Sequence, residues 1–303
     1  MTANSSTSGL LLEYTITRDL INNYNLIPDK DTIDFQIRDK KKIDSFNKDK
    51  FKKFSSAAIE LNKFLSKDLN FLVSKTNTIK RLPDKAGKDD FDVTDIEIGQ
   101  GSKITCISIK NNNESAKHPR PEGLMQSIGF IKDCIEDNEY REELESIKED
   151  FKKFKNNNYP KIEKFPDIEK ETKYKELYLP ICELYSKYIN LYGSKKPETL
   201  FKWFSGSRDY LKIIVWSKPK KDSISIQNYD IESILPKISP LKINSYIKFP
   251  KKGSNNPYIY VEFSNGWIFE IRLKTDSSEI SRMKTKFDVK HHQGQPKKYE
   301  IKF

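Results

Sequence analysis

Residues 90–110 read DFDVTDIEIGQGSKITCISIK and decide the fold. Two runs that alternate apolar and polar residues, as β-strands do, flank the glycine-rich turn Gly99-Gln100-Gly101. A three-residue hairpin loop, with glycines supplying the positive φ angles, would place Asp92 opposite Ser108. Lys110 follows two residues later on the same face, because side chains alternate along a strand. The stretch therefore predicts a hairpin that gathers a carboxylate, a hydroxyl and a lysine at its open end.

A second register of this hairpin stays open. A two-residue loop would bring Asp95 opposite Cys106, because a shift in register changes which residues meet across the strands. If replacing Asp95 reduced activity more than replacing Asp92, the two-residue loop would be favoured.

The residues at the open end of the hairpin suit phosphodiester hydrolysis. Carboxylate oxygens are the ligands that Mg²⁺ prefers, and a divalent ion lowers the pKa of the water that attacks a phosphate. A nearby lysine can orient that water or stabilise the negative charge that grows in the transition state. The hairpin therefore predicts a Mg²⁺-dependent nuclease site, with Asp92 and Asp95 as candidate metal ligands and Lys110 as the catalytic cation.

Several segments carry a family resemblance. They are Asp92-Val93-Thr94-Asp95-Ile96, the run from Ile107 to Arg120, Asn265-Gly266-Trp267-Ile268-Phe269-Glu270-Ile271-Arg272, Ser277-Ser278 and Lys286-Phe287-Asp288-Val289. Together they resemble the HaeIII family of type II restriction endonucleases, within the PD-(D/E)xK nuclease superfamily. The resemblance is concentrated at the two ends of the core and is weaker between them.

The resemblance implies cleavage of double-stranded DNA at a short recognition sequence, GGCC or a related tetranucleotide. It also implies a Mg²⁺ cofactor and a restriction-modification system, in which a cognate DNA methyltransferase is the functional partner. A palindromic site is cut on both strands, so either a homodimer or two successive nicks by a monomer fit this activity.

The chain departs from the superfamily pattern at its middle acidic position. Ser108 stands where D…(D/E)xK has a carboxylate, and a hydroxyl is a poorer metal ligand. We expect another carboxylate to complete the site, and the candidates are Asp95 and Glu60, with Glu97 as a further acid to test. Glu60 lies beside the apolar stripe of a helix expected over residues 51–69. Because Ser108 replaces a ligand, the alternative function is a catalytically weak, sequence-specific DNA-binding or repair-associated module.

DNA-contacting residues are expected directly after the catalytic strand. Asn111 and Asn113 occupy positions where the family pattern alternates histidine with asparagine, so we expect their DNA contacts to differ from those of the family. Lys117, His118 and Arg120 match the family better, and such side chains donate hydrogen bonds to phosphates or base edges.

Composition supports a nucleic-acid partner. The net charge of +11 and the pI near 9.2 attract polyanions, because each neutralised phosphate releases counterions. Three cysteines, Cys106, Cys134 and Cys182, fit neither a metal-ligand spacing nor an even disulfide framework, so we expect reduced thiols. No apolar run approaches the roughly 20 residues that span a bilayer, and the N-terminus lacks a secretory pattern. We expect a cytoplasmic protein with no membrane partner.

The order of the expected elements predicts an α/β fold with a mixed central sheet flanked by helices, which is a restriction-endonuclease-like core. A helical insertion and a strand-rich C-terminal part complete it. We expect one restriction endonuclease domain over residues 1–303. The nuclease core covers about 51–136, the insertion about 137–192 and the C-terminal part about 193–303.

Local signals predict individual elements. Helical spacing appears over residues 9–25, and Pro121 opens an expected crossover helix that runs to Cys134. An apolar helix over 175–191 is expected to be interrupted at Pro180. The remaining expectations are a helix that ends at Gly206, a hairpin turn at Asn265-Gly266, and strands at 210–216, 258–263, 267–273, 287–291 and 299–303.

Overall fold

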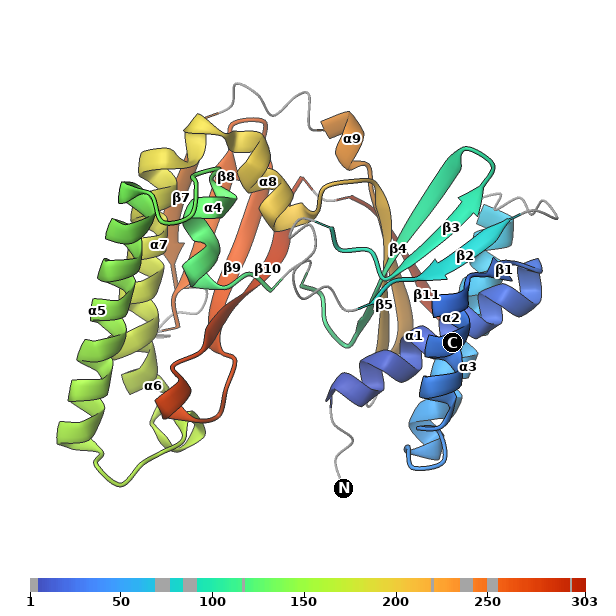
Figure 1. Cartoon of the computed structure of the whole chain (residues 1–303), viewed down its shortest axis with the longest axis horizontal. Coiled ribbons are helices and arrows are strands. Elements are labelled where there is room, and N and C mark those ends of the chain that lie inside the picture. The colour runs from blue at the N-terminus through green and yellow to red at the C-terminus, as the bar shows by residue number, and fades with distance from the viewer. Residues whose placement is uncertain are drawn as a thin grey trace. The chain divides into compact units, whose positions relative to one another are not determined.

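The computed structural model (Figure 1) has two compact units, and each contains a sheet with helices packed on it. This confirms the expected mixed α/β class. The first unit comprises residues 1–114, 208–231 and 296–303, and the second comprises 115–207 and 232–295. The structure describes residues 5–68, 77–83, 92–115, 118–218, 221–234, 242–249, 256–294 and 296–303.

A seven-stranded mixed sheet forms the base of the first unit. Its strands are β1 (Ile27–Pro28), β2 (Thr78–Arg81), β3 (Ile96–Gln100), β4 (Lys103–Asn111), β5 (Tyr210–Lys218), β6 (Lys221–Tyr229) and β11 (Lys297–Lys302). They lie in the order β1-β2-β3-β4-β5-β6-β11, with β1–β2 and β4–β5 parallel and the other pairs antiparallel. The strands expected at 210–216 and 299–303 are confirmed as β5 and β11.

Helices α1 (Ser5–Tyr24), α2 (Lys30–Lys40) and α3 (Lys48–Asp68) pack on this sheet. α1 contacts β4, α2 contacts β2, and α3 contacts β5, β6 and β11. The expected apolar stripe of α3 is buried at Phe54, Ala58, Leu61 and Leu65. Burial of the phenylalanine and leucine side chains contributes about 1.5–3 kcal/mol each to folding. The helices therefore cover the apolar face of the sheet, and the alternate residues of the strands lie on its other face.

The hairpin turn lies further along the chain than expected. Gln100 faces Lys103, which leaves Gly101-Ser102 as a two-residue turn. Gly101 has φ +62°, the left-handed conformation that such a turn requires. Gly99 lies within β3, where an added Cβ would come 2.6 Å from Oγ1 of Thr78 on β2. Gly99 is thus needed for close strand packing and not for the turn.

Both registers considered from the sequence are therefore wrong. In the structure Glu97 faces Cys106. The same register continued beyond the strand places Asp95, and not Asp92, opposite Ser108. The sequence alone does not show which of Gly99 and Gly101 forms the turn, because the role of Gly99 depends on the packing of β2 against it.

A four-stranded antiparallel sheet forms the base of the second unit, in the order β10-β9-β8-β7. Its strands are β7 (Ile243–Lys248), β8 (Tyr258–Phe263), β9 (Ile268–Thr275) and β10 (Thr285–Gln293). The strands expected at 258–263, 267–273 and 287–291 are confirmed. Gly266, with φ +91°, lies in the expected turn between β8 and β9.

Helices α7 (Leu179–Tyr192) and α8 (Pro197–Ser205) supply aromatic and apolar side chains to one face of this sheet. Tyr185 packs on Phe287, and Phe201 packs edge-to-face on Phe263 and Phe269. The helices of this unit are α4 (Leu124–Ser127), α5 (Ile135–Asn158), α6 (Lys170–Lys173), α7 (Leu179–Tyr192) and α8 (Pro197–Ser205), and α9 (Ile231–Ile234) follows β6 in the chain. Shorter turns of helix occur at Pro121–Gly123, Phe165–Asp167, Gly193–Lys195 and Ile280–Arg282, with a π-helical turn at Tyr174–Tyr178.

Two helix predictions need correction. The crossover helix expected from Pro121 to Cys134 is only a short helical segment, because the chain turns at Gly129, whose φ is +92°. The helix expected over 175–191 continues from α6 through the π-helical turn Tyr174–Tyr178 into α7, so Pro180 follows an irregular turn and does not end the helix. The helix expected to end at Gly206 is confirmed as α8.

Cys106, Cys134 and Cys182 are free thiols, and the first and last are buried. In the part of the chain that the structure describes, no helix has the length and apolar character to cross a bilayer.

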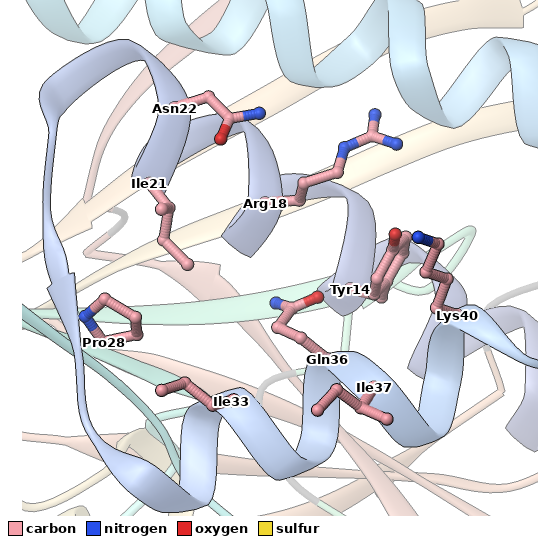
Figure 2. Close-up of a pocket in the computed structure, with 9 residues that line it drawn as sticks. All are labelled: Tyr14, Arg18, Ile21, Asn22, Pro28, Ile33, Gln36, Ile37 and Lys40. Carbon is pink, nitrogen blue, oxygen red and sulfur yellow. The ribbon is translucent and has the colours of Figure 1, made fainter.

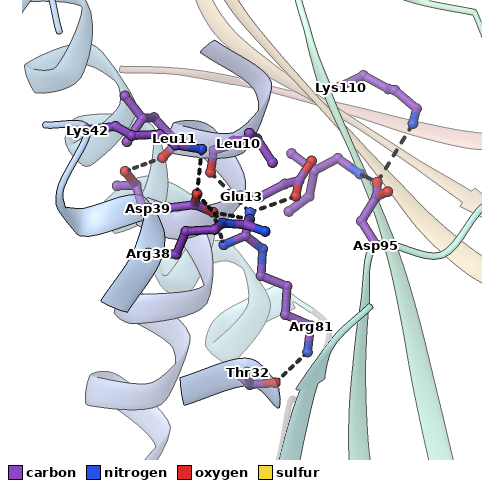
Figure 3. A network of polar contacts seen from close by, with 12 residues as sticks. Leu10, Leu11, Glu13, Thr32, Arg38, Asp39, Lys42, Arg81, Asp95 and Lys110 are labelled. Carbon is purple, nitrogen blue, oxygen red and sulfur yellow. Dashed lines mark hydrogen bonds and ion pairs between the residues drawn. The ribbon is translucent and has the colours of Figure 1, made fainter. Parts of the chain in front are cut away.

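A buried charge network joins α1 and α2 to β2 (Figure 3). Asp39 is fully buried, and its carboxylate lies 2.8 Å from Arg81, 2.8 Å from Arg38 and 2.9 Å from Lys42. Arg81, also buried, lies 2.9 Å from Glu13 of α1. Burial alone would raise the pKa of Asp39, but hydrogen bonds from Arg38 and Lys42 and the charge of Arg81 lower it to about 2. The network holds β2 against both helices.

Replacing Asp39 by Asn should destabilise the fold by about 1.5–3 kcal/mol at pH 7, because buried Arg81 then keeps only Glu13 as a carboxylate partner and loses its charged hydrogen-bond acceptor on α2. Arg38→Ala, the matched change at an exposed partner, should cost under about 1 kcal/mol. Since the pKa of Asp39 is depressed, its contribution is present above about pH 4 and is lost as the pH falls towards about 2. Urea unfolding of both variants at pH 7 and pH 3 measures this. Equal stabilities of the parent and Asp39→Asn at pH 7 would contradict it.

Candidate active site

Asp95 lies at the centre of the polar end of the hairpin. Its Oδ2 accepts hydrogen bonds from the backbone N–H of Ile109 at 2.6 Å and from the hydroxyl of Ser108 at 3.3 Å. The Nζ of Lys110 lies 3.7 Å from the same oxygen. The side chains of Asp95 and Lys110 are each 23% exposed, so both remain open to solvent and to a ligand. The structure therefore brings together Asp95, Ser108 and Lys110 of the expected site.

Backbone hydrogen bonds fix the position of Asp95. Its N–H donates to the carbonyl of Ile107 on β4 at 2.8 Å, and its carbonyl accepts from Leu82, just after β2, at 2.9 Å. The residue is thus held between two strands before β3 begins. A carboxylate fixed in this way loses little conformational entropy on binding a ligand.

Asp92 pairs with an arginine that precedes β5. Its Oδ2 lies 2.6 Å from Nη2 of Arg208, which also lies 2.6 Å from Oε1 of Glu97. Its Oδ1 accepts a hydrogen bond from the N–H of Thr94 at 2.9 Å. Burial alone would lower the pKa of Arg208, but hydrogen bonding to Asp92 and Glu97 raises it above its usual value. Asp92 and Glu97 are therefore paired with a permanent cation.

The donor set at Asp95 fits a hard divalent ion that keeps most of its waters. Mg²⁺ is commonly bound through one or two carboxylates together with phosphate oxygens. In the described structure the contacts of Asp95 all use Oδ2, and Oδ1 takes part in none of them. Within the described ranges, no group of three or more His, Cys, Asp or Glu side chains forms a protein-only metal cage.

Glu60 lies on α3, which packs against β5, β6 and β11. Its carboxylate is 2.6 Å from Lys63 one turn later, in a partly exposed pair. A second helix carboxylate, Glu13, belongs to a helix that contacts a strand of the hairpin. Glu13 belongs to α1, which packs on β4, and it contacts Arg81, whose neighbour across the strands is Ile96.

The expected DNA-contacting residues fall in both units. Asn111 ends β4, and its side chain accepts a hydrogen bond from Asn112 at 2.9 Å, while Asn113 follows in the same unit. His118 and Arg120 belong to the second unit, where Nδ1 of His118 lies 2.8 Å from Asp288 and Arg120 lies 3.4 Å from Asp276. Lys117 lies outside the described residues.

Two cations near the site were not expected from the sequence. Arg208 precedes β5 and pairs with the Asp92–Glu97 carboxylates. Lys212 on β5 is the neighbour of Ser108 across the parallel strands and is buried, with its Nζ donating to the carbonyl of Glu114. A lysine at an inward position of a strand is the one sequence signal that points to Lys212.

A cavity of about 250 Å³ lies between α1 and α2 (Figure 2). Figure 2 shows Gln36 pointing from α2 towards α1 within it. The lining consists of Tyr14, Arg18, Ile21, Asn22, Pro28, Ile33, Gln36, Ile37 and Lys40 and contains no carboxylate. This cavity therefore lacks the anionic ligands that a hard metal ion needs, and the Asp95 site is the better candidate for phosphodiester chemistry.

Comparison with protein families identifies the chain. The profile of the HaeIII restriction endonuclease covers residues 15–296, nearly the whole chain. The chain belongs to the HaeIII restriction endonuclease family. Membership in this family makes the protein a hydrolase that acts on double-stranded DNA, and it confirms the resemblance found in the sequence. No curated protein matches the chain.

The geometry of this family member predicts unequal roles for its two aspartates. Asp95→Asn should lower DNA cleavage at least about a hundredfold, equal to about 2.7 kcal/mol of activation free energy, because it removes the anionic oxygen beside Lys110. The cleavage rate of Asp92→Asn should stay within about tenfold of the parent rate, since Arg208 keeps Glu97 as its partner. Single-turnover cleavage of plasmid DNA measures both rates. A larger loss for Asp92→Asn would contradict the assignment.

Proposed function

We propose that the protein is a Mg²⁺-dependent type II restriction endonuclease. It cuts a short sequence, GGCC or a related tetranucleotide, in the cytoplasm as part of a restriction-modification system with a cognate DNA methyltransferase. The single observation that carries the proposal is the Asp95–Ser108–Lys110 constellation on adjacent strands of a family member. Both units then act as one endonuclease domain over residues 1–303.

Asp95, with the hydroxyl of Ser108 beside it, would hold the metal ion in this proposal. When bound, the ion supplies Lewis acidity to the phosphate and lowers the pKa of the attacking water. The new bond forms between the water oxygen and phosphorus, the bond to the leaving oxygen breaks, and negative charge grows on the phosphoryl oxygens.

Lys110 supplies the positive charge at the place where this negative charge develops. Its Nζ is 3.7 Å from Asp95, so it is held near the scissile phosphate without being fully neutralised by a tight ion pair. Because the site is fixed by the sheet before the substrate arrives, little reorganisation is needed in the transition state. Lys110 therefore acts on the reaction rate more than on DNA affinity.

A helix carboxylate completes the site in place of the acid that Ser108 lacks. Glu60, the candidate from the sequence, lies on a helix that packs against β5, β6 and β11. Glu13 is better supported, because α1 packs on β4 and Glu13 contacts the strand residue paired with Ile96, next to Asp95. We therefore propose Glu13 as the second acid, with Glu60 as the alternative.

The competing function is a DNA-binding or repair-associated module that cuts weakly. The hydroxyl of Ser108, in place of a carboxylate, is the observation that favours it. Incubation of the protein with phage DNA and Mg²⁺ separates the two functions, since discrete fragments show an endonuclease and a gel shift without cutting shows a binder. A homodimer that cuts both strands of a palindrome, or a monomer that nicks twice, each fits the proposed enzyme.

Lys110→Ala should abolish Mg²⁺-dependent cleavage, with a loss of at least about a thousandfold, while DNA affinity changes less than about threefold. The matched control is Lys103→Ala, because Lys103 is an exposed lysine at the other end of the same strand. Cleavage with and without EDTA, together with filter binding, measures both quantities. Cleavage by Lys110→Ala within about tenfold of the parent would remove Lys110 from the mechanism.

Glu13→Gln should raise the Mg²⁺ concentration needed for half-maximal cleavage about tenfold or more, because one anionic oxygen near the ion is lost. Glu60→Gln should leave the Mg²⁺ dependence unchanged. A Mg²⁺ titration of the cleavage rate compares the two variants at a temperature where both are folded. The reverse order would assign the second acid to Glu60.

A further inference from the structure

The sheet of the second unit has one face rich in charge. Strand β9 pairs with β10 so that Lys274 faces Lys286 and Arg272 faces Asp288. Side chains alternate, so these four residues share a face, while their neighbours Phe287, Val289, Leu273 and Ile271 are buried on the opposite, helix-covered face. We call these four charged residues, together with His118, Arg120 and Asp276, the β9–β10 charge cluster.

Asp288 is the buried centre of the β9–β10 charge cluster. Its carboxylate lies 2.8 Å from Arg272, 2.6 Å from Lys274 and 2.8 Å from Nδ1 of His118, and its side chain is only 5% exposed. Burial alone would raise the pKa of Asp288, but hydrogen bonds from His118, Lys274 and Arg272 hold it well below its usual range. Asp288 therefore stays ionised and orients three donors at once.

Asp276 forms a second, smaller centre. It pairs with Lys286 and lies 3.4 Å from Arg120. The side chain of Asp276 is 21% exposed, whereas that of Arg120 is 59% exposed and that of Arg272 is 44% exposed. The carboxylates thus lie inside the cluster and the guanidinium groups lie at its surface.

The cluster carries more positive than negative charge. Its permanent cations are Arg120, Arg272, Lys274 and Lys286, against the carboxylates Asp276 and Asp288. Tyr258, the neighbour of Arg272 on β8, extends the polar face. Burial alone would lower the pKa of Arg272, but its hydrogen bond to Asp288 raises it. An excess of exposed, permanently charged donors suits a polyanion.

The buried carboxylates distinguish base contacts from phosphate contacts. A carboxylate behind an arginine cancels part of its charge, which weakens attraction to phosphates, but it fixes the direction of the guanidinium. A guanidinium held in one direction can donate two parallel hydrogen bonds to O6 and N7 of guanine, which requires orientation as well as charge. The arrangement around Arg272 is therefore suited to reading a base.

We infer that the β9–β10 charge cluster reads DNA sequence, with Arg272 and Arg120 contacting guanine edges and Lys274 and Lys286 contacting phosphates. This inference rests on the proposed function, because it assumes that the protein distinguishes one DNA sequence from others. It assigns recognition to the sheet of the second unit and catalysis to the hairpin of the first.

The test measures binding in EDTA, so that it does not depend on cleavage. The parent protein first selects its preferred duplex from a pool of random-sequence duplexes. The affinities of the parent, Arg272→Ala, Arg272→Lys and Arg120→Ala are then measured on that duplex and on its single-base variants. The control is Arg282→Ala, because Arg282 is an exposed arginine of the same unit that pairs with Glu279 outside the cluster.

Arg272→Ala should weaken binding to the preferred duplex about tenfold to a hundredfold, with little change on duplexes that already lack the contacted guanine. Arg272→Lys should lose the same discrimination while keeping charge, which excludes a purely electrostatic or folding effect. Lys274→Ala should weaken binding to all duplexes equally. It should also reduce the slope of log affinity against log salt concentration by about one. Arg282→Ala should bind as the parent does.

Three results would overturn the inference. The first is that Arg272→Ala weakens binding to all duplexes equally. The second is that this variant binds the preferred duplex as tightly as the parent does. The third is that the parent selects no preferred sequence. Sequence-selective binding that depends on Arg272, without any cleavage in Mg²⁺, would support the inference and overturn the proposed endonuclease function. If the parent cuts DNA at discrete sites but Arg272→Ala still distinguishes the preferred duplex from its single-base variants, the endonuclease function would be supported and the inference about the cluster overturned.

Discussion

The register between β3 and β4 is the constraint on which the rest of the candidate site depends. Side chains of a strand alternate between two faces, so a shift of one residue would send Asp95 to the wrong side of the sheet. The Gly101-Ser102 turn sets this register, and the close approach of Gly99 to Thr78 holds β2 beside it. The result is a carboxylate, a hydroxyl and a lysine on adjacent strands.

The buried charge network stabilises this arrangement from behind the sheet. Arg81 is the last residue of β2. The backbone N–H of the next residue, Leu82, donates a hydrogen bond to the carbonyl of Asp95. Asp39 and Glu13 neutralise Arg81 from two different helices. A buried pair contributes to one defined geometry only when each member keeps its partner. The position of Asp95 therefore depends on Asp39 and Arg81, which are not ligands in the proposed site.

Sequence patterns were sufficient for elements whose burial follows a simple period. The apolar stripe of α3, the alternation of β5 and the glycine that ends α8 each predicted the observed element. The charged helix α2 was not predicted, because its buried acid, Asp39, is recognisable only through Arg81, which is distant in sequence. The same holds at the candidate site. Lys110, Ser108 and Asp95 were recognisable as candidates from the sequence, whereas the pairing of Asp95 with Ser108, and the presence of Arg208 and Glu13 near these strands, depend on which strands and helices meet.

The central claim is that the catalytic metal ion binds at Asp95 on the hairpin of the first unit. The most direct measurement replaces Mg²⁺ by Fe²⁺ in the DNA-bound protein and adds ascorbate and hydrogen peroxide, so that radicals cut the polypeptide near the ion. Mass spectrometry of the fragments should show cuts close to residues 95 and 108–110, and these should disappear when excess Mg²⁺ competes. Cuts confined to the region of Glu60, or elsewhere in the chain and equally suppressed by Mg²⁺, would contradict the account.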